Sequence, residues 1–181
     1  AGLAIGADNE AAIAALARAM ALRFERGRVL LAGEDVGEAI RSEQAGMDAS
    51  LVSALPQVRA AVVALQLAFR TLPGLVADGR DMGTVIFPGA PLKVYLTASA
   101  TRRAERRHQQ LLARGLSAKI ADLRADLEAR DARDMNRSVA PLKPAEDALV
   151  LDNSELTIEQ AVAQVLAWWQ ERQPFAQPAA G

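Results

Sequence analysis

The sequence contains no cysteine and only one histidine, His108. Without cysteine the chain can form no disulfide and no thiolate metal site, and a single histidine nearly excludes a histidine-based metal centre or catalytic triad. Lysine is also scarce, since eighteen arginines and only three lysines carry the positive charge. The net charge of −1 argues against bulk nucleic-acid binding, which needs a basic face. No hydrophobic run approaches a membrane span and no signal peptide is visible, which fits a cytoplasmic protein.

The remaining composition is that of a globular α/β protein. The chain has 181 residues, 51% of them hydrophobic, which is enough to bury a core. Strand-like and helix-like segments alternate from residue 56 onward, which predicts parallel strands joined by crossover helices. Strands are expected at 28–32, 75–78, 92–96 and 148–152. Helices are expected at 8–26, 48–55, 56–72, 99–114, 117–136 and 157–173, followed by a frayed tail from Pro174.

Local signals mark the ends of several of these helices. Asp8 is an expected N-cap, and Gly27 is the expected stop of the same helix. Ser99 is the expected N-cap of the arginine-rich helix that follows the strand at 92–96. Thr157 and Gln160 have the spacing of a capping box, so the last helix is predicted to begin there.

The stretch Asp78–Thr84, with the sequence DGRDMGT, carries the strongest functional signal. It follows an apolar run, and in open α/β sheets ligands bind at the carboxyl ends of strands. Arg80 offers a planar guanidinium to a phosphate or carboxylate, and Asp81 can accept hydrogen bonds from a ring or a sugar. A second cluster at 130–137, RDARDMNR, repeats this composition. Two Arg/Asp clusters predict a small anionic ligand with polar edges, such as a nucleotide.

In their order along the chain, these motifs resemble those of bacterial cytidylate kinases, which phosphorylate CMP and dCMP with ATP. The resemblance is carried by VADGRDMGTVIFP at 76–88, NRSVAPL at 136–142, and ALVLD at 148–152 with the helix start after it. LAGEDV at 31–36 is similar to a strand and turn of that family's monophosphate-binding insert. The resemblance runs from about residue 1 to 172. It implies a P-loop nucleoside monophosphate kinase fold, with a parallel sheet flanked by helices.

One part of the family pattern does not occur in this sequence. The family begins with a strand and a loop of the form G-x-x-x-x-G-K-[ST], whose backbone and lysine hold the ATP phosphates. The three lysines here are Lys93, Lys119 and Lys143, and none follows glycine. The chain is therefore expected to be an N-terminally truncated kinase that lacks its first strand and phosphate loop. Residues 1–54 would be the remainder of the insert and 55–181 the kinase core, with a lid at about 100–120.

The resemblance assigns four arginines to phosphate groups. Arg80 would contact the acceptor phosphate, and Arg137 would reach the transferring phosphoryl group. Arg106 and Arg107, on the expected lid helix, would close onto the ATP phosphates. The competing interpretations are a structural ion pair between Arg80 and a neighbouring aspartate (Asp78 or Asp81), and a solvated helix face for the lid arginines.

The resemblance also assigns residues to the cytosine base. Asp81 would accept from the exocyclic amine, with Ser50 and Arg59 as its partners in reading the base. Uracil has a carbonyl where cytosine has the amine, so a buried acceptor would be left unpaired by UMP. The alternatives are that Ser50 is an ordinary helix residue and Arg59 a surface charge.

Arg130 and Asp134 would contact the ribose and phosphate by the same resemblance. Together with Arg137 they lie at positions i, i+4 and i+7, so one helical face could carry all three. A ladder of salt bridges on a solvated helix is the alternative for such a run of charges.

The expected function is phosphoryl transfer from ATP to CMP or dCMP, by a monomer that needs no nucleic acid or membrane. Mg²⁺ would accompany ATP, and no metal ligand is expected within this chain. Without a phosphate loop the 181 residues alone are expected to be inactive or nearly so. Two alternatives stay open: a different acceptor, such as UMP, AMP or shikimate, or a non-catalytic nucleotide-binding module.

Overall fold

The computed structural model describes residues 2–174, so the expected tail beyond Pro174 lies outside the described residues. The chain divides into two compact units, which we describe in turn. The first comprises Ala1–Ala77 with Arg137–Val139, and the second Asp78–Asn136 with Ala140–Gly181. No single described helix is both long and apolar enough to cross a membrane. The consecutive helices Glu43–Val52 and Pro56–Ala68 meet those criteria only as a pair, and the chain bends by 106° between them.

The first unit begins with a short 3-10 turn, η1 (Ala7–Asn9), and the helix α1 (Glu10–Arg18). The single helix expected over 8–26 is therefore wrong, because its second half forms the strand β1 (Leu22–Glu25). Strand β1 pairs antiparallel with β2 (Arg28–Leu31). Arg26 and Gly27 form the turn between them with φ angles of 49° and 77°, the left-handed values that two-residue hairpin turns require. Gly27 thus lies in the turn of a hairpin instead of ending a helix.

The strand expected at 28–32 is confirmed as β2, which also pairs with the short strand β3 (Glu34–Asp35). After a 3-10 turn, η2 (Ala39–Arg41), the helix α2 (Glu43–Val52) begins five residues before the expected start. The Ser42 hydroxyl caps it by accepting from the Ala45 amide at 3.2 Å.

Helix α3 (Pro56–Ala68) begins at the expected proline and ends four residues before the expected 72. Leu55 supplies no side-chain cap, and the Glu10 carboxylate instead accepts from the Gln57 amide at 2.7 Å. This contact places a negative charge at the positive end of α3, where α1 packs against it. The small core of this unit contains the buried side chains of Ala14, Leu30 and Val58.

The strand expected at 75–78 is absent from the structure. Residues 75–77 have no regular secondary structure, and the Val76 side chain is fully exposed. An extended segment becomes a stable strand only when its backbone groups pair with a neighbour and its side chains are covered. Neither condition is met here, although the apolar composition of the segment is that of a buried strand.

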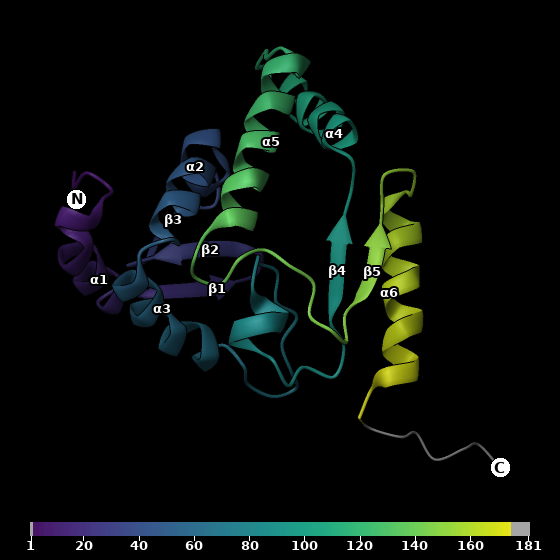
Figure 1. The fold of residues 1–181 in the computed structure, drawn as a ribbon, viewed down its shortest axis with the longest axis horizontal. Helices are drawn as coiled ribbons and strands as arrows, with labels where there is room; N and C mark the ends of the chain where they lie inside the picture. The colour runs from purple at the N-terminus through teal and green to yellow at the C-terminus, as the bar shows by residue number, and fades with distance from the viewer. Residues whose placement is uncertain (1, 175–181) are drawn as a thin grey trace. The chain divides into compact units, whose positions relative to one another are not determined.

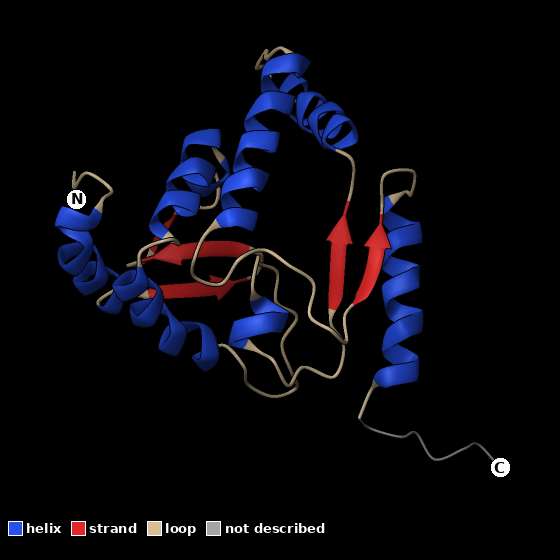
Figure 2. Cartoon of the chain, viewed as in Figure 1, coloured by secondary structure: helices blue, strands red, loops and turns tan. Residues whose placement is uncertain are grey.

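The second unit contains a parallel pair of strands, β4 (Val94–Thr97) and β5 (Leu149–Asp152), shown side by side in Figure 2. Both were expected from the sequence. Helix α4 (Ala100–Leu112) follows β4 and packs against α5 (Ile120–Asn136), as Figure 1 shows. The Ser99 hydroxyl caps α4 as expected, accepting from the Arg102 amide at 3.2 Å. Helix α5 begins three residues after the expected Ser117.

The last helix, α6 (Ile158–Arg172), begins with the expected capping box. The Thr157 hydroxyl accepts from the Gln160 amide at 3.2 Å, and the Gln160 side chain accepts from the Thr157 amide at 2.9 Å. The helix then runs back along the unit, since Arg172 near its end donates to the carbonyl of Asp147 just before β5. The parallel pair with helices after each strand confirms the expected α/β class. Buried apolar side chains of this unit are Ile86, Ala104, Leu123 and Leu151.

Candidate functional site

A buried carboxylate lies between two of the predicted arginines in the second unit. Asp134, on the last turn of α5, is only 3% exposed, and its Oδ2 accepts from Arg80 Nε at 3.1 Å. Arg130 Nε lies 4.0 Å from the same oxygen. The ion pair of Arg80 is therefore with a residue 54 positions away, and not with its neighbours Asp78 or Asp81 as the alternative interpretation proposed. Two partly exposed guanidiniums around one carboxylate leave a net positive charge, which suits a bound anion.

The burial of Asp134 also weighs against a solvated ladder of salt bridges on α5. The exposed pair between Arg124 and Glu128 on the same helix has the features of such a ladder, with both side chains about half exposed. Arg137, in contrast to the expectation, does not share the helical face of Arg130 and Asp134. Helix α5 ends at Asn136, and Arg137 belongs to the first unit. Because Arg137 lies just beyond the end of the helix, the i+7 spacing from Arg130 does not place it on the helical face of Arg130 and Asp134.

The loop that carries Arg80 ends in a π-helical turn, η3 (Met82–Ile86). Asp81 precedes this turn and is buried at 7% exposure, and its carbonyl accepts from the Val85 amide at 2.9 Å. Buried next to Arg80, the Asp81 side chain lies in the loop that the sequence predicted to bind the ligand. The turn therefore fixes the backbone at Asp81, the residue that follows Arg80.

Lys93 supports the same loop from the start of β4. A Cβ placed on Gly83 would lie 3.3 Å from both Cγ and Cδ of Lys93, so the lysine stem passes directly over this glycine. The ammonium of Lys93 lies 2.9 Å from both carboxylate oxygens of Asp147. These hydrogen bonds from Lys93 hold the pKa of the Asp147 carboxyl below its ordinary value. Neither Lys93 nor Asp147 was singled out from the sequence, because their pairing depends on the parallel alignment of β4 and β5.

Three further predicted residues lie together in the first unit, around the end of α2. Ser50 is buried at 8% exposure, and its carbonyl accepts from the Ser53 hydroxyl at 2.9 Å. Arg137 Nη1 donates to the same hydroxyl at 3.0 Å, and Arg59 Nη1 donates to the Ser53 carbonyl at 3.3 Å. Ser50, Arg59 and Arg137 therefore converge on one residue, Ser53, that the sequence did not indicate. Its only signal was its place three residues after Ser50, on the same side of the helix.

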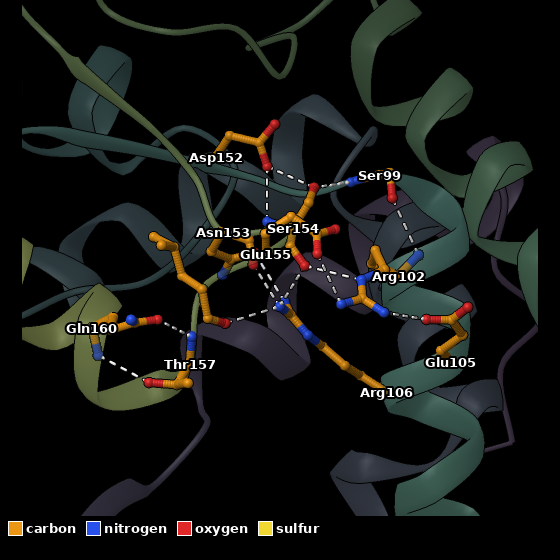
Figure 3. Close-up of polar contacts among 11 residues, drawn as sticks. Ser99, Arg102, Glu105, Arg106, Asp152, Asn153, Ser154, Glu155, Thr157 and Gln160 are labelled. Carbon is orange, nitrogen blue, oxygen red and sulfur yellow. Dashed lines mark hydrogen bonds and ion pairs between the residues drawn. The ribbon is translucent and has the colours of Figure 1, made fainter.

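Two arginines of α4, Arg102 and Arg106, contact the loop that follows β5, as Figure 3 shows. Arg106 Nη1 donates to the Asn153 side chain at 3.0 Å, and its Nη2 donates to backbone carbonyls of the same loop, at Asn153, Ser154 and Leu156. Arg102 Nε donates to the Ser154 carbonyl at 3.0 Å. Arg106 therefore organises a loop in this structure, whereas its predicted partner was a phosphate. Arg107, also predicted for phosphate, donates to the Gln110 side chain on its own helix at 3.4 Å.

The Ser154 hydroxyl connects the segment that follows β4 with the loop that follows β5 (Figure 3). The Ser99 amide donates to the Ser154 hydroxyl at 2.9 Å, and that hydroxyl donates to Asp152 Oδ1 at 2.6 Å. The Ser154 hydroxyl and amide together hold the pKa of the Asp152 carboxyl below its ordinary value. Arg103 ties α4 to α5 through an ion pair with Asp131. The start of α4 is thus fixed to both α5 and the loop after β5.

Comparison with known proteins identifies the family. The family model described as cytidylate kinase matches residues 3–171. The chain belongs to the cytidylate kinase family. It is 56% identical over 165 residues to the cytidylate kinase of Cupriavidus necator, covering 91% of this chain and 74% of the relative. It is 57% identical over 167 residues to that of Cupriavidus pinatubonensis, covering 91% of this chain and 76% of the relative. It is 56% identical over 172 residues to that of Burkholderia mallei, covering 95% and 74%.

The family membership confirms the resemblance noted in the sequence, and with it the nucleoside monophosphate kinase fold. It also confirms that the chain belongs to a family of phosphotransferases.

Proposed function

We propose that this protein transfers a phosphoryl group from ATP to CMP or dCMP, giving CDP or dCDP. The match to the cytidylate kinase model over residues 3–171 carries this proposal. Phosphoryl transfer needs positioning and neutralisation of charge more than covalent chemistry. The arginine-rich clusters around Asp134 and Ser53 are suited to those two tasks.

We assign Arg80 to the acceptor phosphate of CMP and Arg137 to the phosphoryl group that this phosphate receives, and we propose that Arg137 also contacts the CMP phosphate. Each guanidinium is oriented by an oxygen acceptor, Arg80 by Asp134 and Arg137 by Ser53. A planar guanidinium held in this way keeps donors for a phosphate, and each charge-assisted hydrogen bond contributes about 1.5–3 kcal/mol. Arg130, which shares Asp134 with Arg80, and Asp134 itself are assigned to the ribose and phosphate.

We assign the cytosine base to Asp81, Ser50 and Arg59. The burial of Asp81 and Ser50 favours base discrimination, because a buried acceptor that loses its donor is costly. Cytosine offers the exocyclic amine to such an acceptor, and uracil offers only a carbonyl. Preference for CMP over UMP is therefore expected.

We assign Arg106 and Arg107 to the ATP phosphates. Arg106 can reach a phosphate only after it releases the carbonyls of the loop after β5, so closure of α4 is part of this assignment.

Mg²⁺ accompanies ATP in such reactions, and among residues 2–174 no cluster of three acidic, histidine or cysteine side chains is placed to hold a metal. We assign Mg²⁺ no ligand in this chain. We also propose a cytoplasmic protein, since ATP and CMP are cytoplasmic metabolites, and separately a monomer.

Two measurements on the 181-residue chain test the proposal. Isothermal titration calorimetry with CMP tests the acceptor site by itself. We expect Arg80→Ala to raise the dissociation constant for CMP at least tenfold. A coupled ADP-release assay with CMP and ATP tests the donor side. Because no lysine in the sequence follows glycine, we expect little turnover from these residues alone. Absence of CMP binding would contradict the acceptor assignment, and turnover typical of a kinase would contradict the need for a phosphate loop.

A non-catalytic nucleotide-binding module is the second candidate, and the same pair of measurements separates it from a kinase. Such a module binds CMP and has no turnover, even when a chain carrying G-x-x-x-x-G-K-[ST] upstream of these residues is assayed. A kinase gains turnover in that longer chain.

A further inference from the structure

Ser53 lies at the carboxyl end of α2, where the helix leaves its last carbonyl groups without intrahelical donors. The Ser53 amide donates to the Ala49 carbonyl at 2.9 Å, and its hydroxyl donates to the Ser50 carbonyl at 2.9 Å. The Ser53 carbonyl in turn accepts from Arg59 at 3.3 Å. A helix end therefore supplies the oxygen atoms around which Ser50 and Arg59 are arranged.

The hydroxyl of Ser53 has a second function, because a hydroxyl can donate one hydrogen bond and accept others. It donates to Ser50 and accepts from Arg137 Nη1 at 3.0 Å. Ser53 and Arg137 are 84 positions apart in the sequence, so this single oxygen connects two distant segments of the first unit. The side chain of Arg137 is long and has several rotatable bonds, and a fixed acceptor at its end selects one of its many orientations.

We propose that Ser53 is a positioning residue for recognition of the CMP phosphate. Its hydroxyl orients the Arg137 guanidinium, while its backbone carbonyl orients Arg59. The inference rests on the proposed function, since it takes Arg137 and Arg59 as CMP contacts. Ser53 itself touches no part of CMP in this account.

The hydroxyl and the carbonyl of Ser53 can be separated by mutation. Ser53→Ala removes the hydroxyl and leaves the backbone carbonyl for Arg59. The hydrogen bond from Arg137 to this hydroxyl is then lost, and the hydrogen bond from Arg59 to the carbonyl is retained. The effect should therefore fall on the phosphate of the ligand and not on its base.

The experiment compares CMP with cytidine, which has the same base and no phosphate. Dissociation constants are measured by titration calorimetry for CMP and by NMR shift titration for cytidine, on the 181-residue chain. We expect Ser53→Ala to weaken CMP binding roughly tenfold, the effect of one hydrogen bond to a charged group. Cytidine binding should stay within about twofold of the wild type, and Ser53→Thr, which keeps a hydroxyl, should restore most of the CMP affinity.

Ser42→Ala is the matched control. It removes a serine hydroxyl from the other end of the same helix, where the hydroxyl accepts from the Ala45 amide. The Ser42 variant should lose stability without a change in the ratio of CMP to cytidine affinity.

Three results would overturn the proposal. Ser53→Ala could bind CMP as tightly as the wild type, or it could weaken CMP and cytidine equally, which is the result of a merely structural role. Ser53→Thr could also fail to restore CMP binding. If instead the wild type bound no CMP, the proposed function itself would fail and the role of Ser53 with it, so the two failures are distinguishable.

Discussion

Replacing Asp134 with alanine tests the arrangement that holds Arg80. The carboxylate is 3% exposed, whereas the side chains of Arg80 and Arg130 are 39% and 30% exposed. Breaking a fully buried ion pair costs about 3–5 kcal/mol, and breaking a fully exposed one costs about 0.2–1 kcal/mol. Because the arginines reach solvent while the carboxylate does not, we expect an intermediate loss of about 2 kcal/mol in the free energy of unfolding.

For a chain of this length, a loss of that size lowers the melting temperature by about 4–8 °C. Thermal unfolding followed by circular dichroism at pH 7 measures it directly. Glu128→Ala on the same helix is the matched control, since its exposed pair with Arg124 should contribute less than about 0.5 kcal/mol. The double variant Arg80→Ala, Asp134→Ala should lose less than the sum of the single variants, with a coupling of about 1 kcal/mol.

Two results would contradict this expectation. In the first, Asp134→Ala melts within 1 °C of the Glu128 variant, and in the second, the losses of the Arg80 and Asp134 variants are simply additive. The first result would mean that the buried carboxylate does not stabilise the unit, and the second that Arg80 is not its partner.

Three further predictions concern stability. Hydrogen bonds from Lys93 lower the folded-state pKa of Asp147. The stabilisation that Asp147 gives to the folded state is therefore present above the unfolded pKa of about 3.9 and is lost as the pH falls through the lower folded value. The difference in melting temperature between the wild type and Asp147→Asn should be constant from pH 5 to 7 and shrink below about pH 3.5. A difference independent of pH would contradict this. Thr157→Ala removes a hydroxyl from the capping box of α6, so its free energy of unfolding in urea should fall by about 1 kcal/mol, whereas that of Thr157→Ser should stay within about 0.5 kcal/mol of the wild type. Equal losses in the two variants would exclude the hydroxyl as the cause. Val76→Asp should change the free energy of unfolding by less than about 0.5 kcal/mol because Val76 is fully exposed, and a loss of several kcal/mol would mean that a buried strand forms there.

The elements that the sequence predicted correctly are those with strong local signals. Strand β5 is a short apolar run, α3 begins at Pro56, and the capping box of α6 depends on two residues three positions apart. Each of these signals acts within one turn or one strand, so the sequence by itself contains it.

The errors arose where a partner elsewhere in the chain decides the structure. Phe24 continues the helical spacing of the preceding residues, yet pairing with Val29 across the Arg26–Gly27 turn makes it part of a strand. Composition predicted a strand at 75–78, but no neighbour covers Val76 in this structure. Propensity is a weak signal when tertiary pairing competes with it.

The candidate site shows the same division. Its charged residues could be identified from two motifs, because guanidiniums and carboxylates in these patterns point to a nucleotide. The contacts that orient them could not be identified, since Asp134 lies 54 positions from Arg80 and Ser53 lies 84 positions from Arg137. Contacts between residues so far apart become visible only when the chain is folded.

The proposed function depends above all on recognition of CMP through both its base and its phosphate. Calorimetric titration of the 181-residue chain with CMP and with UMP, under identical salt and pH, tests it most directly. We expect CMP to bind at least tenfold more tightly than UMP, and Arg59→Ala to remove most of this preference. Equal affinity for the two nucleotides, or a preference for UMP, would contradict it.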